Sequence, residues 1–405
     1  MKSGLKGDTL LSGIRILDLA DEKASFCSKI LADLGAAVIK VEPPGGDAAR
    51  NRGPFAGNNA HPEESLSFLY NNINKRGITL DIEHRRGREI FLRLAEKSEV
   101  VVETFQPGYL DGLKLGFDVL SRVNPGLVLL SVTGFGQSGP RKNFKTCDSV
   151  ASAYGGQMVT AGLPAKAPLK PYGDQSYHIA SLYGAIAILI ARRKQIRTGV
   201  GEHIDISIQE AVTSTLEHQM IRYFYEKAVS RRQGSLHWNN LFCILPCRDG
   251  FIQITLFHQW ETLVEWMAAE GMAEDLQDAH WADETFRLKH VGHVIEVLQR
   301  WTEKHTTREL FELGQLMHFP WAPVVAPEAV LKCPQHKSRG FFVDIDGCGG
   351  KRSLKVPRLP YIFSSHTVDR CRRAPLAGED NAEIYVGELG FTREDLDRLS
   401  VDQVI

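Results

Sequence analysis

Two aspartates stand directly before predicted helices, where a carboxylate can serve as a nucleophile or as a helix cap. Asp174 precedes an apolar helix predicted over 176–193, and Asp148 precedes a shorter segment, 149–155. The positive end of a helix favours the charged form of a carboxylate. Such a group can attack an activated carbonyl, and the amides that follow can stabilise the oxyanion. The same positions suit ordinary N-caps, so capping stays open for both residues.

Other familiar chemical motifs are either absent or lack the surrounding elements that they need. Gly134–Gly139 satisfies G-x-G-x-x-G after a strand, but Pro140 follows where a helix should open. The first strand–helix–strand unit has no glycine between Leu19 and Leu34. Nicotinamide and flavin binding are therefore not expected. The chain also lacks a P-loop and H-E-x-x-H, and its 14 dispersed histidines predict no metal site.

The elements that must position the aspartates alternate in the first half of the chain. A β-rich run over 14–19, a helical stretch over 24–34 and a second run over 37–42 form a βαβ unit. Further strands are expected over 77–81, 100–104, 127–133 and 203–208, which predicts an α/β fold with a parallel sheet.

The second half has a different character. One long amphipathic helix is predicted from 209 to about 225. After Arg231, a strand over 251–255 and helices rich in Trp and Glu predict a smaller α+β domain. The tail, 383–405, is expected to be helical and charged.

Composition limits the class of protein. The chain has 405 residues, 43% hydrophobic and 24% charged, with a formal net charge of −1. Such a chain forms a substantial core and offers no general basic field, so nucleic acid and membrane partners are not expected. The seven cysteines are scattered and odd in number, which predicts buried thiols in a reducing cytoplasm rather than disulfides. The N-terminus has no signal-peptide pattern.

Strings along nearly the whole chain, taken in order, resemble the family III CoA-transferases, the group that includes formyl-CoA transferase and the carnitine CoA-transferases. The quoted strings are Leu11-Ser-Gly-Ile-Arg-Ile-Leu-Asp18, Leu34-Gly-Ala-Ala-Val-Ile-Lys-Val-Glu-Pro-Pro-Gly-Gly-Asp47, Asn74-Lys-Arg-Gly-Ile-Thr-Leu-Asp81, Glu103-Thr-Phe-Gln-Pro-Gly108, Ser131-Val-Thr-Gly-Phe-Gly-Gln-Ser-Gly-Pro140, Tyr172-Gly-Asp174, Thr198-Gly-Val-Gly-Glu-His-Ile-Asp205, Trp321-Ala-Pro-Val, Ser338-Arg-Gly-Phe341 and Glu388-Leu-Gly-Phe.

The resemblance implies a large Rossmann-like parallel-sheet domain and a smaller α+β domain, in two chains that interlock like linked rings. It places the N-terminal part of the large CoA-binding domain at 1–205 and a linker helix at 206–230. The small domain follows at 231–325, and the return linker with the rest of the large domain at 326–405. The partner chain is either a second copy or a paralogous subunit.

The resemblance also implies an activity: moving coenzyme A from an acyl-CoA donor to a free carboxylic acid. The CoA thioester is a substrate, and no permanently bound cofactor is expected. Asp174 matches the nucleophile that carries aspartyl intermediates, and Asp148 an acidic position that orients substrate or nucleophile. The positions that match CoA contacts are Lys23, Ala24, Leu80, Thr104, Phe105 and Lys145.

The chain departs from formyl-CoA transferase where that enzyme has cations. Pro43, Glu83 and Gly112 replace two arginines and a lysine. The CoA phosphates must then find other cations, for which Arg50, Lys75, Arg76 and Lys114 are candidates.

The acceptor is expected to be larger than formate or oxalate. No glycine-rich loop occurs at 254–260, which is aromatic instead, and 46–65 resembles the benzylsuccinate-type branch. An aryl-substituted succinate, with succinyl-CoA as donor, is the expectation.

Two alternatives remain. An α-methylacyl-CoA racemase shares the fold, but that branch has a histidine where Cys147 stands. A non-catalytic subunit of a hetero-oligomeric transferase would have no chemical need of Asp174.

Overall fold

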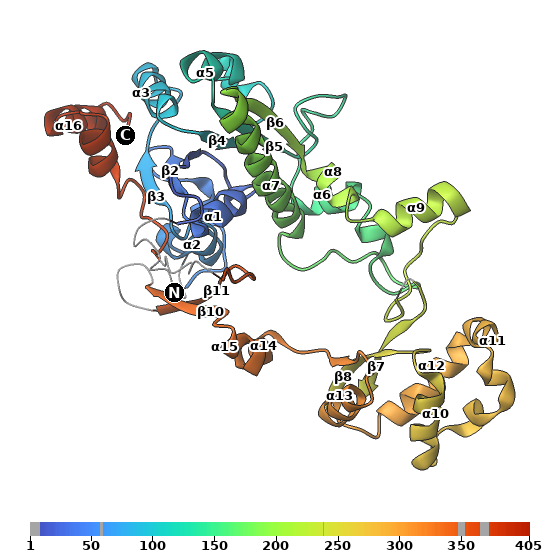
Figure 1. Ribbon diagram of the computed structural model, residues 1–405. Coiled ribbons are helices and arrows are strands. Elements are labelled where there is room, and N and C mark those ends of the chain that lie inside the picture. The colour runs from blue at the N-terminus through green and yellow to red at the C-terminus, as the bar shows by residue number, and fades with distance from the viewer. Residues whose placement is uncertain (1–8, 57–59, 238, 347–352, 365–371) are drawn as a thin grey trace. The chain divides into compact units, whose positions relative to one another are not determined.

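The computed structural model describes residues 9–56, 60–237, 239–346, 353–364 and 372–405 (Figure 1). They form two compact units: the first lies within 1–157, 172–217 and 337–405, and the second within 158–171 and 218–336. No sequence pattern predicts that 158–171 belongs to the second unit. The division into a CoA-binding domain, a linker and a small domain, with those functions, stays a prediction.

Six short strands form a parallel sheet in the order β3-β2-β1-β4-β5-β6. Leu17 of β1 pairs with Ile39 on one side and Val101 on the other, so the strand order reverses between β1 and β4. In such a sheet, ligands bind outside the carboxyl ends of the strands at the point of reversal. The predicted α/β fold with a Rossmann-like sheet is confirmed. The strands are β1 (Arg15–Asp18), β2 (Ala37–Glu42), β3 (Arg76–Thr79), β4 (Val100–Glu103), β5 (Val128–Thr133) and β6 (Glu202–Ser207).

Helices cover both faces of this sheet (Figure 1). Successive side chains of a strand point to opposite faces, so Ile16 lies in one hydrophobic cluster and Leu17 in another. The first cluster packs against α1 (Ser25–Asp33), α6 (Asp148–Tyr154), α7 (Gln175–Thr198) and α8 (Ile208–Thr213). The second packs against α3 (Arg85–Glu96), α4 (Tyr109–Gly112), α5 (Phe117–Val123) and the C-terminal tail.

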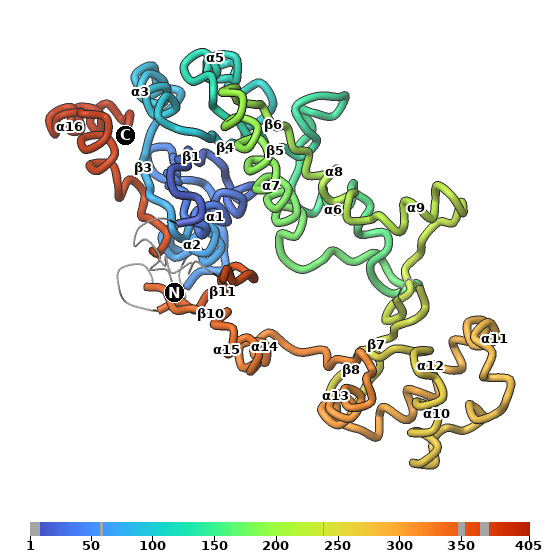
Figure 2. The backbone as a smooth tube through the Cα atoms, in the orientation of Figure 1, coloured from blue at the N-terminus to red at the C-terminus, as the bar shows by residue number. Residues whose placement is uncertain are grey.

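The tail completes the edge of the sheet at β3. The N–H of Gly77 donates to Asp380 Oδ2 (2.7 Å), and that of Thr79 to Asn381 Oδ1 (3.0 Å). A Cβ at Gly77 would lie 2.8 Å from Pro375, so only glycine allows this approach. The tail then forms the π-helix η7 (Ala382–Glu388) and α16 (Arg393–Val401), beside the N-terminal half (Figure 2). The predicted helical tail is thus two helices.

The prediction of one long helix over 209–225 is wrong, because this segment forms two helices, α8 and α9 (Glu217–Glu226). The hydroxyl of Ser214 donates to the carbonyl of Ala211, and that of Thr215 to Val212, both at 2.7 Å. These bonds back to the preceding turn compete with continuation of the helix. The break marks the passage from the first unit to the second.

The second unit packs helices against a small antiparallel sheet in the order β7-β8-β9. Its core holds Trp301 and Trp321, each at most 1% exposed. The elements are β7 (Phe242–Cys247), β8 (Gly250–Thr255), α10 (Trp260–Ala269), η4 (Glu274–Gln277), η5 (Ala279–Ala282), α11 (Glu284–Lys289), α12 (Val291–Thr302), α13 (Thr307–Leu316) and β9 (Ala322–Pro323).

The remaining elements are short. They are η1 (Ala48–Asn51), η2 (Pro62–Glu64), α2 (Leu66–Asn71), η3 (Met158–Thr160), α14 (Pro327–Lys332), α15 (Pro334–Ser338) and the hairpin β10 (Phe342–Asp346) and β11 (Ser353–Pro357). Within the described ranges, every helix is too short or too polar to cross a membrane.

Candidate active site

Asp174 stands at the N-terminus of α7, but its side chain does not cap the helix. The cap comes from Asp148, whose Oδ1 accepts the N–H of Ser176 at 2.9 Å. The hydroxyl of Ser176 donates in turn to the carbonyl of Asp148 (3.2 Å), and both residues are buried. Capping by Asp174 is therefore wrong as an interpretation of the sequence. Asp148 does not cap its own helix either, since Cys147 is the N-cap residue of α6 and its side chain makes no capping bond.

The backbone around Asp174 leaves space on its N-terminal side. Gly173 has φ +78°, in the left-handed region that side chains disfavour. Among the described residues, a Cβ there would meet only the Gln175 side chain, at 3.7 Å. Since Asp148 takes the amide of Ser176, that amide is not open to an oxyanion.

Arg52 supplies positive charge beside Asp174. Its Nη2 lies 3.2 Å from Oδ2 and 3.4 Å from Oδ1 of Asp174, and its Nη1 lies 3.3 Å from Oε1 of Glu22. Burial works against the charge of Arg52, but the two carboxylates outweigh it, so the pKa of Arg52 is raised. Burial and the neighbouring Asp21 raise the pKa of Glu22. Sequence reasoning missed Arg52, because a lone arginine before Gly53-Pro54 belongs to no chemical motif.

A cavity of about 480 Å³ opens at the reversal point of the sheet, outside the carboxyl ends of β1, β2, β3 and β4. The rings of Phe105 and Tyr109, 4.6 Å apart, belong to its wall. The lining residues are Leu19, Asp21, Val41, Glu42, Pro43, Asp47, Ala48, Leu80, Asp81, Ile82, Glu83, Thr104, Phe105 and Tyr109.

Three of the predicted CoA-contact residues, Leu80, Thr104 and Phe105, line this cavity together. The hydroxyl of Thr104 donates to Asp21 Oδ1 (2.8 Å) and accepts the N–H of Asp21, which joins the loops after β4 and β1.

The other predicted CoA-contact residues lie outside the cavity lining. Lys23 forms an ion pair with Asp21, which does line it. Ala24 is fully buried in the core, and Lys145 is exposed on the segment before α6.

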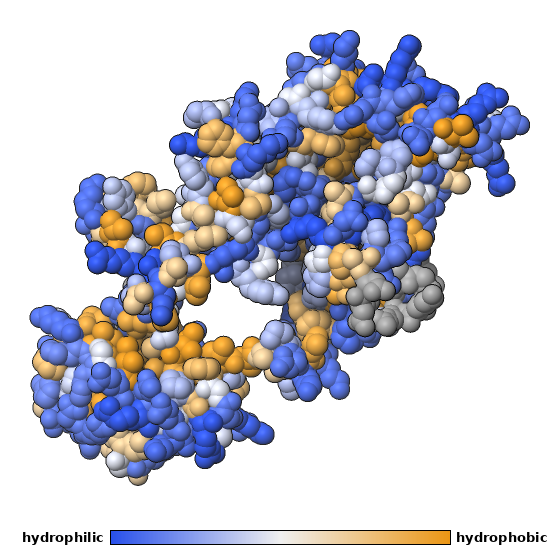
Figure 3. Space-filling view, turned by 180° about the vertical axis from the view of Figure 1, so that it is seen from behind, coloured by the Kyte–Doolittle hydropathy of each residue, from blue (hydrophilic) through white to orange (hydrophobic). Residues whose placement is uncertain are grey.

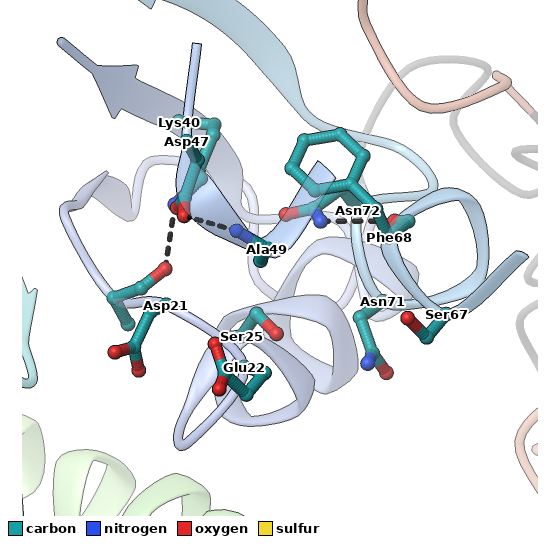
Figure 4. A pocket seen from close by; sticks show the side chains of 11 residues that line it. Asp21, Glu22, Ser25, Lys40, Asp47, Ala49, Ser67, Phe68, Asn71 and Asn72 are labelled. Carbon is teal, nitrogen blue, oxygen red and sulfur yellow. Dashed lines mark hydrogen bonds and ion pairs between the residues drawn. The ribbon is translucent and has the colours of Figure 1, made fainter. Parts of the chain in front are cut away.

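A narrower crevice of about 10 Å³, close to the space of one water molecule, shares Asp21 and Asp47 with the cavity (Figure 4). Glu22, the partner of Arg52, lies in its wall. Asn71 of α2 also lines it, with a buried Oδ1 that has no hydrogen-bond partner among the described residues. The crevice thus shares Asp21 and Asp47 with the cavity, and Glu22 with the group formed by Glu22, Arg52 and Asp174.

The cations proposed from sequence for the CoA phosphates are mostly committed to the fold. Arg50 is 2% exposed and binds Glu42 through Nε (2.6 Å) and Nη2 (2.7 Å). Lys75 is fully buried, 2.8 Å from Asp18, and burial lowers its pKa to about 8. For these residues the prediction is wrong, because each neutralises a buried carboxylate.

Of the other two candidate cations, one is also committed to the fold and one is exposed. Arg76 pairs with Glu383 and Glu388 of the tail, which commits it to the fold as well. Lys114 is exposed.

Arg88 of α3 is a cation that sequence reasoning missed. Its Nη1 donates to the carbonyl of Glu83 (2.5 Å), a residue of the cavity lining. Glu83 also accepts the hydroxyl of Tyr109 (2.6 Å). Arg88 therefore brings positive charge to the rim of the cavity.

The cysteines only partly match the predicted buried thiols. Cys27 and Cys243 are buried, Cys247 and Cys333 are half-buried and Cys147 is exposed. The prediction is wrong for Cys147, because it precedes α6 in an exposed segment. Cys348 and Cys371 lie outside the described residues.

The segment 254–260 does not present an aromatic surface. Leu256, Phe257 and Trp260 are at most 8% exposed and belong to the core of the second unit. The aromatic content of this segment therefore serves packing, and it gives no support to a bulky acceptor.

Comparison with known proteins gives a consistent result. Residues 11–381 match the family model of CoA-transferase family III. The chain is 34% identical to the BbsE subunit of succinyl-CoA:(R)-benzylsuccinate CoA-transferase from Thauera aromatica, over 96% of both chains. It is 31% identical to the beta subunit of succinyl-CoA–L-malate CoA-transferase from Chloroflexus aurantiacus, over 98% of both.

The fold agrees with that result. The crystal structure of a CaiB/BaiF family protein from Brucella suis superposes with a TM-score of 0.83 at 30% identity, covering 94% of this chain and 99% of that one. The family model, the relatives and the shared fold each span nearly the whole chain, so they describe one and the same kind of protein. The chain belongs to CoA-transferase family III and is a CoA-transferase.

Proposed function

We propose that this enzyme transfers CoA from succinyl-CoA to a substituted succinate or a related dicarboxylic acid through covalent intermediates on Asp174. The observation that carries the proposal is the carboxylate at the N-terminus of α7. Because Asp148 caps α7, the carboxylate of Asp174 is not used as a cap, and it faces Arg52.

The chemistry divides into two exchanges. The carboxylate of Asp174 attacks the donor thioester, the carbon–sulfur bond breaks, and a mixed anhydride and CoA thiolate form. The thiolate attacks the aspartyl carbonyl of the anhydride and releases succinate, which leaves an aspartyl-CoA thioester. The acceptor carboxylate then attacks this thioester, and the freed thiolate takes the acceptor acyl group and restores Asp174. One oriented carboxylate thereby replaces an encounter of two free anions.

The cavity at the reversal point suits the nucleotide end of CoA. Phe105 and Tyr109 offer aromatic faces to adenine, and Leu80 and Thr104 lie beside them. The guanidinium of Arg88 at the rim supplies charge for phosphate.

The donor and acceptor classes rest on the relatives. Both are named for succinyl-CoA, and both act on a four-carbon dicarboxylic acid or its benzyl derivative according to their names. Efficient turnover of oxalate without activity on benzylsuccinate, malate or related acids would contradict this assignment.

The partner is another chain of the same fold, in an intertwined dimer. One face of α7 carries Leu182, Ile186 and Ile190 at helical spacing, each at least 50% exposed in the single chain. Apolar residues in orange also reach the surface on the face shown in Figure 3. Such contiguous apolar surface is typical of a protein interface.

We place the enzyme in the cytoplasm. Its five described cysteines are free thiols, as expected in a reducing compartment.

Replacing Asp174 by Asn tests the nucleophile. The Asp174→Asn variant keeps the volume but not the charged oxygen, so it should fold and bind CoA while turnover falls by ~10³ or more. In the native enzyme, donor followed by hydroxylamine should modify the peptide that contains Asp174. Asp118→Asn, in the exposed first turn of α5, is the matched control. Near-native turnover of the Asp174 variant, or labelling confined to Asp148, would overturn the assignment.

A non-catalytic subunit is the second candidate, favoured by the word "subunit" in the names of both relatives. Assay of the purified chain alone separates the two. Transfer activity that needs a second, paralogous chain and survives Asp174→Asn would establish the non-catalytic role.

A further inference from the structure

Two arginines in one short segment bind carboxylates in different ways. Arg50 donates two hydrogen bonds to the carboxylate of Glu42, of 2.6 and 2.7 Å, and is 2% exposed. Arg52 lies 3.2 to 3.4 Å from its carboxylate partners, at or beyond the long end of N–H···O bonds, and its side chain is 39% exposed. Its Nη1 is buried and makes no hydrogen bond to any residue that the structure describes, only the longer ion contact with Glu22. Arg52 is therefore held loosely and retains donor capacity.

The charge around Arg52 changes during the proposed reaction. At rest, one guanidinium faces the two carboxylates of Asp174 and Glu22. Once Asp174 is an anhydride or a thioester, its charge is gone and the guanidinium keeps only Glu22. A positive group with unsatisfied donors then lies next to the carbonyl that the acceptor must attack.

We propose that Arg52 binds the reacting carboxylate of the acceptor acid, in place of Asp174, while Asp174 carries CoA. This inference rests on the proposed function and adds an acceptor-binding residue to it. An acceptor oxygen bound at Nη2 lies beside the aspartyl carbonyl carbon. Attack there forms the carbon–oxygen bond of the second anhydride as the carbon–sulfur bond breaks and CoA thiolate leaves. Acceptor binding thus becomes favourable only after the first exchange.

The test compares binding of succinate, used as the carboxylate probe, by calorimetry. The Asp174→Asn chain imitates the uncharged state of residue 174, so it should bind succinate on the order of tenfold more tightly than the native chain. The double variant with Arg52→Gln should lose that gain, and one with Arg52→Lys should keep part of it. Arg122→Gln, at an exposed arginine of α5, is the control. Equal affinity of the native and Asp174→Asn chains, or a gain that persists in the double variant with Arg52→Gln, overturns the proposal.

Kinetics of the Arg52→Gln single variant give a second readout. Donor labelling of Asp174 should stay within a few-fold of native, while the KM for the acceptor rises and more intermediate is lost to water. A fall in labelling equal to the fall in transfer would show a role in placing Asp174 only, and would reject acceptor binding. Near-native turnover by Asp174→Asn would instead reject the nucleophile, so the two failures are distinguishable.

Discussion

Arg50 and Arg52 lie two residues apart and carry the same charge, but Arg50 stabilises the fold whereas Arg52 is proposed to act in the reaction. The guanidinium of Arg50 lies over the ring of Phe68 (4.0 Å to its centroid) and closes a buried ion pair with Glu42. Removing one partner of such a pair leaves an uncompensated buried charge, which costs about 3–5 kcal/mol. Arg52 is exposed enough to exchange its partner, and that exposure is what the proposed reaction uses.

Glu103 should make the stability of the protein depend on pH. It lies at the carboxyl end of β4, 4% exposed, and burial raises its pKa from 4.5 to about 7 against hydrogen bonds from Ser131 and the N–H of Phe105. The folded state therefore holds a proton that the unfolded chain has lost. The contribution of Glu103 to the free energy of unfolding should be fully present below pH 4.5 and fall by about 3 kcal/mol as the pH rises to 7.

Urea unfolding at pH 4.5 and pH 8 checks this. The Glu103→Gln variant should lose little free energy of unfolding between these pH values. Its free energy of unfolding relative to the native chain should therefore be more favourable at pH 8 than at pH 4.5. The exposed Glu89→Gln serves as control. An identical pH profile for the native chain and the Glu103→Gln variant would contradict the burial effect.

At the scale of elements, the cap of α7 is supplied by another helix. Asp148 belongs to α6, yet it accepts the N–H of the fully buried Ser176 in the first turn of α7. Asp148→Ala should cost about 1–2 kcal/mol of unfolding free energy and lower kcat, because the first turn then loses its anchor. Asp148→Asn retains an oxygen acceptor and should keep most of both. Urea unfolding and transfer assays decide, and equal losses in the two variants would show that charge, not capping, matters.

The strands and helices around the site were predictable because their patterns are local. Runs such as 37–42 and 127–133 are apolar, β-rich and separated by helical stretches, which defines a parallel sheet. The break between α8 and α9 was not predictable, because Ser214 and Thr215 interrupt an otherwise amphipathic pattern through bonds to their own preceding turn.

The candidate site divides in the same way. Asp174 and Asp148 are predictable from their place before helices and from family strings. Arg52 lies 122 residues from Asp174, and its contact exists only after the sheet has formed. The capping of α7 by Asp148, in place of Asp174, likewise depends on packing between α6 and α7.

At the scale of the whole molecule, the exposed face of α7 predicts a stable dimer. Sedimentation at micromolar concentration should give twice 45.2 kDa. Interlocked chains should not exchange with tagged chains until urea unfolds them. Ile186→Lys, on that face, should lower the yield of dimer, whereas Val401→Lys, 82% exposed on α16, should not. A stable 45.2 kDa monomer would reject the interlocked dimer.

Because the tail completes the edge of β3, this edge stays unpaired until the end of the chain has been synthesised. The outward N–H groups of β3 wait for Asp380 and Asn381, which emerge from the ribosome about 300 residues later. At roughly 5–20 residues per second, this delay lasts on the order of 15–60 s. During that time the nascent first unit carries an unpaired strand edge, while the second unit can already fold behind it.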